Sequence, residues 1–188
     1  MKKLSYLFFV SAAVIALAAF RPVAGKLVSR NAHISFFSHT SLEDITANNY
    51  KVVSTLETST GDVVFSVPMQ SFEFEKALMQ EHYNSKDFLN TKAFPKAKFE
   101  GKISNISTVN FSQDGTYAVD VNGNMTIKET TKPVIAKGTV TIKEGKVNAT
   151  TKFNLVLADY EVAFKKGKPS TNIAKEIEIT VHADYLPE

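Results

Sequence analysis

Apolar and polar residues alternate along most of the C-terminal half of the chain. The alternation runs through residues 117–128, 134–143, 146–157 and 176–185, with apolar residues or glycine on one side and mostly lysine, threonine, asparagine or glutamate on the other. A period of two residues places successive side chains on opposite faces of a β-strand. We therefore predict four long strands, each with one apolar face and one face in water.

A two-residue turn at Glu144-Gly145 separates two of these runs and is typical of a β-hairpin. The predicted pairs are Ile142 with Val147, Val140 with Ala149, Gly138 with Thr151, and Ala136 with Phe153. All four pairs lie on the apolar face. This register is self-consistent, because a slip of one residue would turn the apolar side chains of one strand to the opposite face.

The N-terminal half predicts strands at residues 33–39, 50–57, 63–69 and 98–109. A helix is predicted over residues 72–83, because apolar positions recur there at helical spacing. Its apolar face would carry Phe74, Leu78, Met79 and His82.

The total is about eight antiparallel strands with one or two short helices inserted in the middle of the chain. Strands with one apolar face must curl or stack to bury that face, and closure removes the sheet edges. The predicted fold class is therefore all-β, a closed antiparallel barrel of about eight strands.

A barrel of this size is either filled by side chains or holds one small ligand. Small residues are predicted on the inner face among larger apolar ones, at Ser54, Gly101, Gly123, Ala136, Gly138, Ala149, Thr151 and Ala183. They either fit the taper of a solid core or leave a cavity. If a cavity exists, its lining is nearly uncharged and suits a long apolar molecule.

The candidate ligand-binding residues are those predicted to line this cavity or to plug it. They are Ile34, Phe36, Phe65, His82, Phe88, Phe94, Phe99, Val119, Val121, Val140, Phe153 and Ile179. The plug is residues 81–101, an irregular, aromatic-rich segment that contains Pro95. Because strands supply only walls, we expect Phe88 and Phe94 to close one end of the barrel. The alternative is that these aromatic residues anchor the segment on the outer surface.

Residues 1–24 have the pattern of a secretory signal peptide, with Lys2 and Lys3 before an apolar run. Cleavage after Ala18 and cleavage after Ala24 both fit. Residues 25–188 then form one domain. We expect a periplasmic or secreted protein with no stable membrane span in its mature form.

Charge and motifs exclude several functions. Three of the 22 basic residues lie in the leader, so 19 basic residues face 19 acidic ones in the domain, and a nucleic-acid partner is not expected. The chain has no cysteine. No nucleophile elbow, phosphate loop or HExxH motif occurs, and His33 and His39 lie too far apart along one strand to share a metal. We predict no catalytic residues, no metal and no cofactor.

Two stretches resemble the YceI-like, polyisoprenoid-binding family. The first is HYNSKDFLNTKAFPKAKFEG, which matches the family signature at His82, Ser85, Asp87, Phe88, Pro95 and Phe99, while Tyr83 stands where the signature has leucine. The second, VNGNMTIKETTKPV, is similar to another segment of that family. AHISFFSHT and AKEIEITVHADYL are similar to its first and last strands.

The resemblance implies a lipocalin-like barrel, often periplasmic, that binds an isoprenoid or similar amphiphile in its pore. The resulting hypothesis is an exported protein that holds a long-chain apolar lipid of the isoprenoid or isoprenoid quinone type. Two alternatives stay open. The barrel is filled and acts as an envelope interaction module, or it is an enzyme that acts on a lipid.

Overall fold

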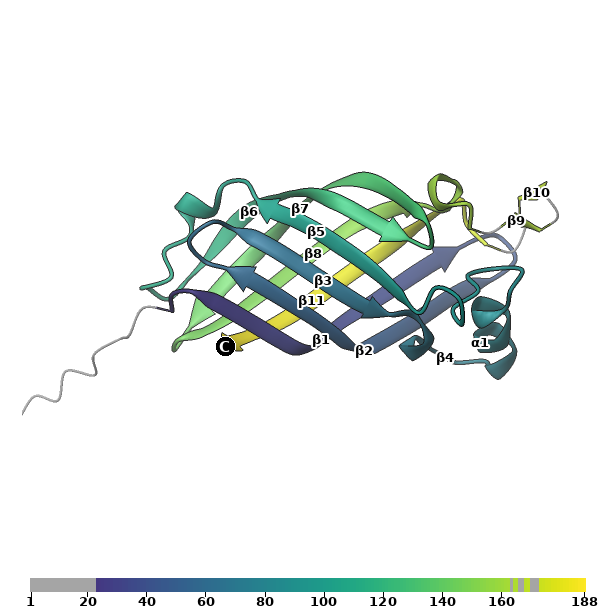
Figure 1. The fold of residues 1–188 in the computed structure, drawn as a ribbon, viewed down its shortest axis with the longest axis horizontal. Coiled ribbons are helices and arrows are strands. Elements are labelled where there is room, and N and C mark those ends of the chain that lie inside the picture. Colours follow the sequence, from purple (N-terminus) through teal and green to yellow (C-terminus); the bar gives the residue numbers. More distant parts are fainter. Residues whose placement is uncertain (1–22, 163, 166–167, 170–172) are drawn as a thin grey trace, which may run out of the picture.

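A computed structural model describes residues 23–162, 164–165, 168–169 and 173–188. It confirms the predicted fold class, because eight long strands form a closed antiparallel barrel (Figure 1). These strands are β1 (Lys26–His39), β2 (Asp44–Glu57), β3 (Asp62–Pro68), β5 (Lys96–Ile103), β6 (Gly115–Ile127), β7 (Thr130–Lys143), β8 (Lys146–Val156) and β11 (Glu176–Pro187). The shorter elements are β4 (Glu73–Phe74), β9 (Phe164–Lys165), β10 (Lys168–Pro169), α1 (Ala77–Asn84), and the 3-10 helices η1 (Met69–Ser71), η2 (Ile106–Thr108) and η3 (Leu157–Tyr160).

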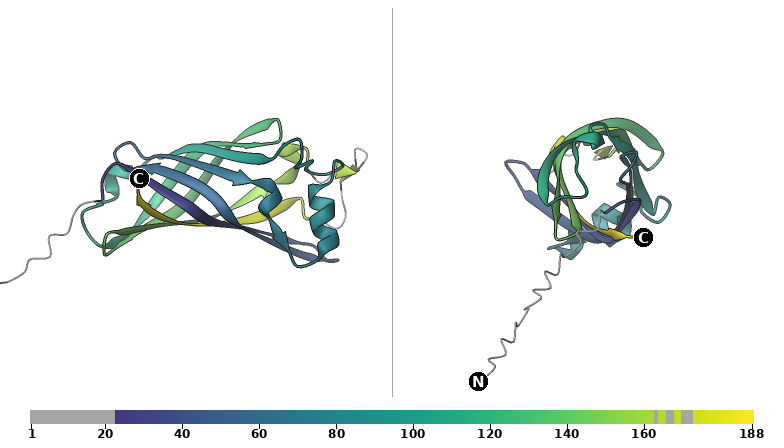
Figure 2. Two further views of the ribbon diagram at one scale, coloured as in Figure 1. Left: turned by 60° about the horizontal axis from the view of Figure 1, so that its bottom comes forward. Right: turned by 90° about the vertical axis from the view of Figure 1, so that its left-hand side faces the viewer.

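The sheet closes between β1 and β2. Around the barrel the order is β1-β11-β8-β7-β6-β5-β3-β2, and β2 returns to β1. The closing pair extends from Lys26 opposite Glu57 to His39 opposite Asp44. The end-on view in Figure 2 shows the ring of strands that results. Closure pairs strand backbones that would otherwise form two edges.

The predicted helix begins later than its apolar pattern indicated. Phe74 lies in β4 and pairs with Ala47 of β2, so the chain is still extended there, and α1 starts at Ala77. Leu78 is 61% exposed, whereas Tyr83 is buried. The spacing of Phe74 and Leu78 was therefore coincidental, because pairing with β2 overrides the local helical pattern.

The predicted strand at residues 98–109 ends early, at Ile103. Beyond it the Asn105 side chain bonds the backbone of β6, accepting from Asp120 N at 2.8 Å and donating to Ala118 O at 3.1 Å. A side-chain amide thus replaces the partners that a continued strand would have supplied.

The hairpin at Glu144-Gly145 has the predicted register at three of its four pairs, the last being Gly138 opposite Thr151. The fourth pair, Ala136 with Phe153, does not form. Beyond Gly138, β7 stays paired with β6, and beyond Thr151, β8 stays paired with β11. The two strands follow their other neighbours and separate.

The end of the barrel opposite α1 is filled. Its largest fully buried side chains include Leu27, Leu56, Ile142 and Val147. Ser54 and Tyr185 are also buried there, and their hydroxyls share a hydrogen bond of 2.6 Å. Burial raises the pKa of Tyr185 to about 12, and the bond to Ser54 opposes that rise. The Tyr185 phenol is therefore neutral at physiological pH, and it provides the buried Ser54 hydroxyl with a hydrogen-bond partner.

The predicted leader, residues 1–24, lies outside the described residues except at Val23 and Ala24. Val23 is buried, and its amide donates to Phe111 O at 3.2 Å. No helix in the described part of the chain has the length and apolar character needed to cross a membrane.

The Ser54–Tyr185 pair gives a stability test. Tyr185→Phe leaves the Ser54 hydroxyl buried without its partner and should lower the free energy of unfolding by about 1–3 kcal/mol. Ser54→Ala should lower the free energy of unfolding by a similar amount, because it leaves the Tyr185 hydroxyl without its partner. The double variant should be more stable than the sum of the single losses implies, because no orphan hydroxyl remains. Urea unfolding of all four proteins measures the coupling, and strictly additive losses would contradict it.

Candidate functional site

The half of the barrel nearer α1 is hollow. The cavity has a volume of about 1110 Å³ and extends from Leu56 and Tyr185, near the filled end, to His82 in α1. Its walls are formed mainly by valine, isoleucine, leucine and phenylalanine. Pockets for drug-sized ligands usually have volumes of about 300–1,000 Å³. This cavity therefore accommodates a ligand at or above the upper end of that range.

All but one of the predicted ligand-binding residues line this cavity. Those in its wall or at its mouth are Ile34, Phe36, Phe65, His82, Phe88, Phe99, Val119, Val121, Val140, Phe153 and Ile179. They come from seven strands and from the segment around α1. The alternation of each strand placed them on the inner face, and closure of the sheet brings them together.

Phe94 is the exception, because it does not line the cavity. The chain reverses at Asn90, which has a positive φ of 47°, and the amide of Phe94 donates to Asn90 O at 2.9 Å. Asparagine tolerates this left-handed backbone conformation. The turn carries Phe94 to a half-exposed position, and Leu89 is the buried residue that lines the cavity instead. Sequence reasoning missed Leu89 because aromatic content, and not turn geometry, guided the choice.

The predicted small residues do not all leave free space. A Cβ atom added at Gly101 or at Gly123 would lie 2.5 Å from Cζ of Phe99. The tip of the Phe99 ring therefore lies over both glycines, which face each other across β5 and β6. Here the small residues make room for a large neighbour, and the cavity lies beyond the ring.

An aromatic cap covers the α1 end of the cavity. It consists of Phe36, Phe72, Phe74, Tyr83 and Phe88, and Tyr83 is at its centre. Ring centroids lie 5.0 Å from Tyr83 for Phe74, 5.7 Å for Phe72, 6.2 Å for Phe36 and 6.4 Å for Phe88. These separations are typical of favourable aromatic pairs. Part of the predicted plug, around Tyr83 and Phe88, thus closes the barrel from within.

The hydroxyl of Tyr83 has only a weak partner. It donates to Sδ of Met69 at 3.9 Å, and thioether sulfur is a poor acceptor. Burial raises the pKa of this phenol far above its ordinary value, so the group is neutral. The cap therefore contains a buried, neutral hydrogen-bond donor whose present acceptor is weak.

Polar side chains gather where the cavity reaches the surface beside α1. His82 and Asp87 are exposed there, and Ser85 and Glu43 are partly exposed. The Glu43 carboxylate forms an ion pair with Lys76 Nζ at 3.0 Å. Because the other end of the cavity is apolar, the site as a whole is amphipathic.

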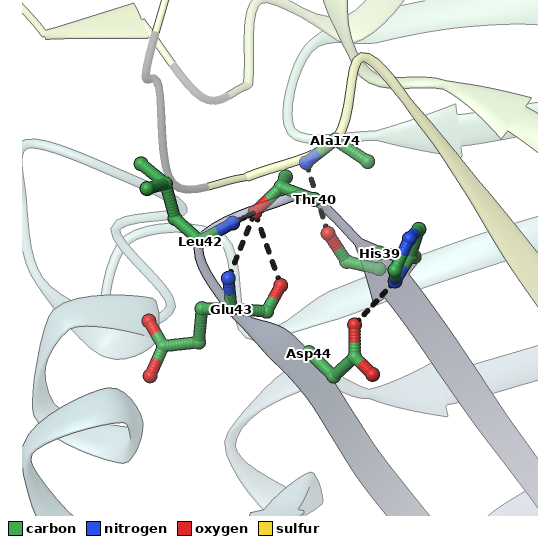
Figure 3. A network of polar contacts seen from close by, with 7 residues as sticks. His39, Thr40, Leu42, Glu43, Asp44 and Ala174 are labelled. Carbon is green, nitrogen blue, oxygen red and sulfur yellow. Dashed lines mark hydrogen bonds and ion pairs between the residues drawn. The ribbon is translucent and has the colours of Figure 1, made fainter.

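The turn between β1 and β2 holds one side of this mouth in place (Figure 3). The hydroxyl of Thr40 accepts from the amides of Leu42 and Glu43 and donates to Glu43 O at 3.1 Å. Ser38, which is buried, accepts from Ala174 N at 2.9 Å. The turn is thereby tied to the segment that precedes β11.

The other histidines lie outside the cavity lining, and His33 and His182 stack with ring centroids 6.2 Å apart. On the outer face His33 stacks on Tyr50, with centroids 4.4 Å apart, and Nε2 contacts Asn48 Oδ1 at 2.9 Å. His39 is paired with Asp44 on the turn. Within the described ranges, no three His, Asp or Glu side chains are grouped as metal ligands would be.

The cap predicts a difference between two phenylalanines. Phe88→Ala removes a side chain that lines the cavity and one aromatic contact of Tyr83, worth about 1 kcal/mol, and should raise the dissociation constant of an apolar fluorescent dye on the order of fivefold. Phe94→Ala is the matched control, because Phe94 lies outside the cavity, and its dissociation constant should be unchanged. Fluorescence titration of variants that retain the parent's circular dichroism makes the comparison. Equal effects of the two substitutions would contradict the role of the cap.

Comparison with solved structures finds the same barrel elsewhere. A polyisoprenoid binding domain from Saccharophagus degradans, implicated in plant cell wall breakdown, is similar with a TM-score of 0.73 and 9% identity, over 88% of this chain and 99% of that one. BcnA of Burkholderia cenocepacia has a TM-score of 0.69 and 17% identity, over 83% and 96% of the two chains. The YCEI protein of Campylobacter jejuni has a TM-score of 0.61 and 14% identity, over 80% and 90%.

At these identities the likenesses show a shared fold. No curated protein matches the chain. A family described as the YceI-like domain matches residues 26–185, from the first strand of the barrel to the last. The chain therefore belongs to the YceI-like domain family.

Proposed function

We propose that this protein is an exported carrier that holds the apolar chain of a long amphiphilic lipid, of the isoprenoid or isoprenoid quinone type, inside the barrel. The observation that carries the proposal is the amphipathic cavity of about 1110 Å³, apolar in its depth and polar at the mouth beside α1. The leader-like pattern of residues 1–24 supports export.

The depth of the cavity favours hydrocarbon. Side chains such as Val119, Val140 and Val181 offer no hydrogen-bonding group, so a polar ligand would lose its water without compensation. A hydrocarbon chain instead gains about 0.8 kcal/mol for each methylene moved out of water. A long chain gains most, because each added unit contributes again until the cavity is full.

The mouth favours a polar head group at the α1 end. His82, Ser85 and Asp87 lie there and would contact it from the surface side. The neutral hydroxyl of Tyr83 would contact it from the cavity side, and a quinone carbonyl or an alcohol oxygen is a stronger acceptor than the sulfur of Met69. The head group would therefore lie at the mouth while the chain fills the barrel.

The family supports the same ligand class. The similar structure from Saccharophagus degradans is described as a polyisoprenoid binding domain. Binding is also favoured over catalysis, because most groups that line the deep part of the cavity are hydrocarbon side chains that cannot exchange protons, and the Tyr185 hydroxyl found there is already bonded to Ser54. The alternative of a filled barrel is disfavoured by the cavity itself.

Lipid extraction tests the proposal directly. Protein purified from the exported fraction should yield, on organic extraction and mass spectrometry, one lipid with a long apolar chain at close to one equivalent per chain. Protein depleted of lipid should regain the ligand from isoprenoid quinone in detergent. A depleted protein that takes up no long-chain lipid would defeat the proposal.

A bulky substitution tests where the lipid lies. Val121→Trp places a large ring in the cavity and should reduce the bound lipid by roughly tenfold, because several methylenes lose their place. Asn122→Trp, one residue along β6, adds the same ring on the exposed face and should retain the parent's lipid content. The ratio of lipid to protein is read by mass spectrometry after each variant is shown to be folded. Equal retention by the two variants would place the lipid outside the barrel.

A further inference from the structure

The wall of the barrel opens between β7 and β8. The two strands pair from Lys143 opposite Lys146 to Gly138 opposite Thr151, and no further. Residues 130–137 of β7 remain paired with β6, and residues 152–156 of β8 remain paired with β11. Among the described residues these two stretches, here called the seam, have no pairing across the space between them.

The pairing ends at a defined point. The hydroxyl of Thr151 donates to Lys137 O at 2.7 Å. A side chain of β8, and not a backbone amide, thus bonds this carbonyl of β7 at the start of the seam. At Gly138 the strands are close, because an added Cβ atom would lie 2.5 Å from Thr150 O. The strands are thus held together up to this pair and are free of each other directly beyond it.

The cavity extends to the seam. Thr139 and Thr150 lie on the outer face, where their hydroxyls are 2.7 Å apart, and yet both line the cavity. A separate groove of about 160 Å³ lies at the seam, and Val134, Leu155 and Tyr160 line both the groove and the cavity. The side chains of these three residues separate the interior from the surface here, and η3, which contains Tyr160, packs against β7.

The outer rim of the seam carries two exposed apolar side chains among polar ones, which include Lys132, Asn154 and Asp159. Ile135 of β7 is 80% exposed and Val156 of β8 is 41% exposed, and both line the groove. On the outer face of a barrel such side chains are usually polar. Ile135 and Val156 therefore place hydrocarbon at the surface next to Val134 and Leu155, which line both the groove and the cavity.

We propose that the seam between β7 and β8 is a side entrance through which the hydrocarbon chain of the lipid enters and leaves the cavity. The proposal rests on the proposed function. At the α1 end the rings packed on Tyr83 cover part of the opening, and the proposed head group would occupy the mouth beside them. Passage through the seam breaks no backbone hydrogen bond between β7 and β8, because the pairing has already ended. The chain therefore moves sideways while the cap stays closed.

Cross-linking the seam tests the proposal. Lys137→Cys/Lys152→Cys places two exposed thiols at the start of the seam, one on each strand. A bis-maleimide joins the strands, and the same double variant treated with N-ethylmaleimide carries equal modification without the link. The probe is cis-parinaric acid, a fluorescent polyene fatty acid, followed by stopped-flow fluorescence. Linking should slow both association and dissociation on the order of tenfold and leave the dissociation constant unchanged, since a blocked path alters rates and not end states.

Two further cross-links make the outcome specific. Thr141→Cys/Asn148→Cys links the same strands where they already pair, and the rates should not change. Glu43→Cys/Lys76→Cys links the mouth beside α1, where the parent side chains form an ion pair. If this link slows exchange and the seam link does not, the lipid passes through the α1 end and the side entrance is wrong. If unlinked protein fails to bind the probe at all, the proposed function fails and the side entrance with it.

Discussion

Closure of the sheet between β1 and β2 is the constraint on which the rest of the structure depends. Pairing from Lys26 opposite Glu57 to His39 opposite Asp44 gives both strands a partner on each side. A wall whose backbone groups are paired exposes only side chains to the interior. The interior can then be apolar and still hollow, because no peptide group there needs water.

The filled end and the hollow end differ in how side chains meet across the barrel. At one end Leu27, Leu56, Ile142 and Val147 interlock, and Ser54 satisfies Tyr185. Towards α1 the wall residues are of similar type, but they do not meet across the barrel, and the aromatic cap covers the space. Filling one end supplies packing for stability, while the other end remains available for a ligand.

The seam between β7 and β8 departs from this closure in a limited way. Its strands keep one neighbour each, β6 and β11, so neither loses its place in the sheet. Gly138 and Thr151 fix where the separation starts. The barrel thus combines a rigid wall, a capped end and a local opening, and the proposed lipid exchange depends on the last of these.

The sequence by itself determined the strands of the C-terminal half, the hairpin at Glu144-Gly145 and the inward side chains, because alternation and turn chemistry are local. It could not place Phe94 outside the cavity, since the turn at Asn90 sets that position. Nor could it shorten the helix to Ala77–Asn84, which depends on Phe74 pairing with β2. Whether Gly101 and Gly123 leave space or receive the Phe99 ring was decided by tertiary packing. The separation of β7 from β8 was decided in the same way, because each strand follows a neighbour that is distant along the chain.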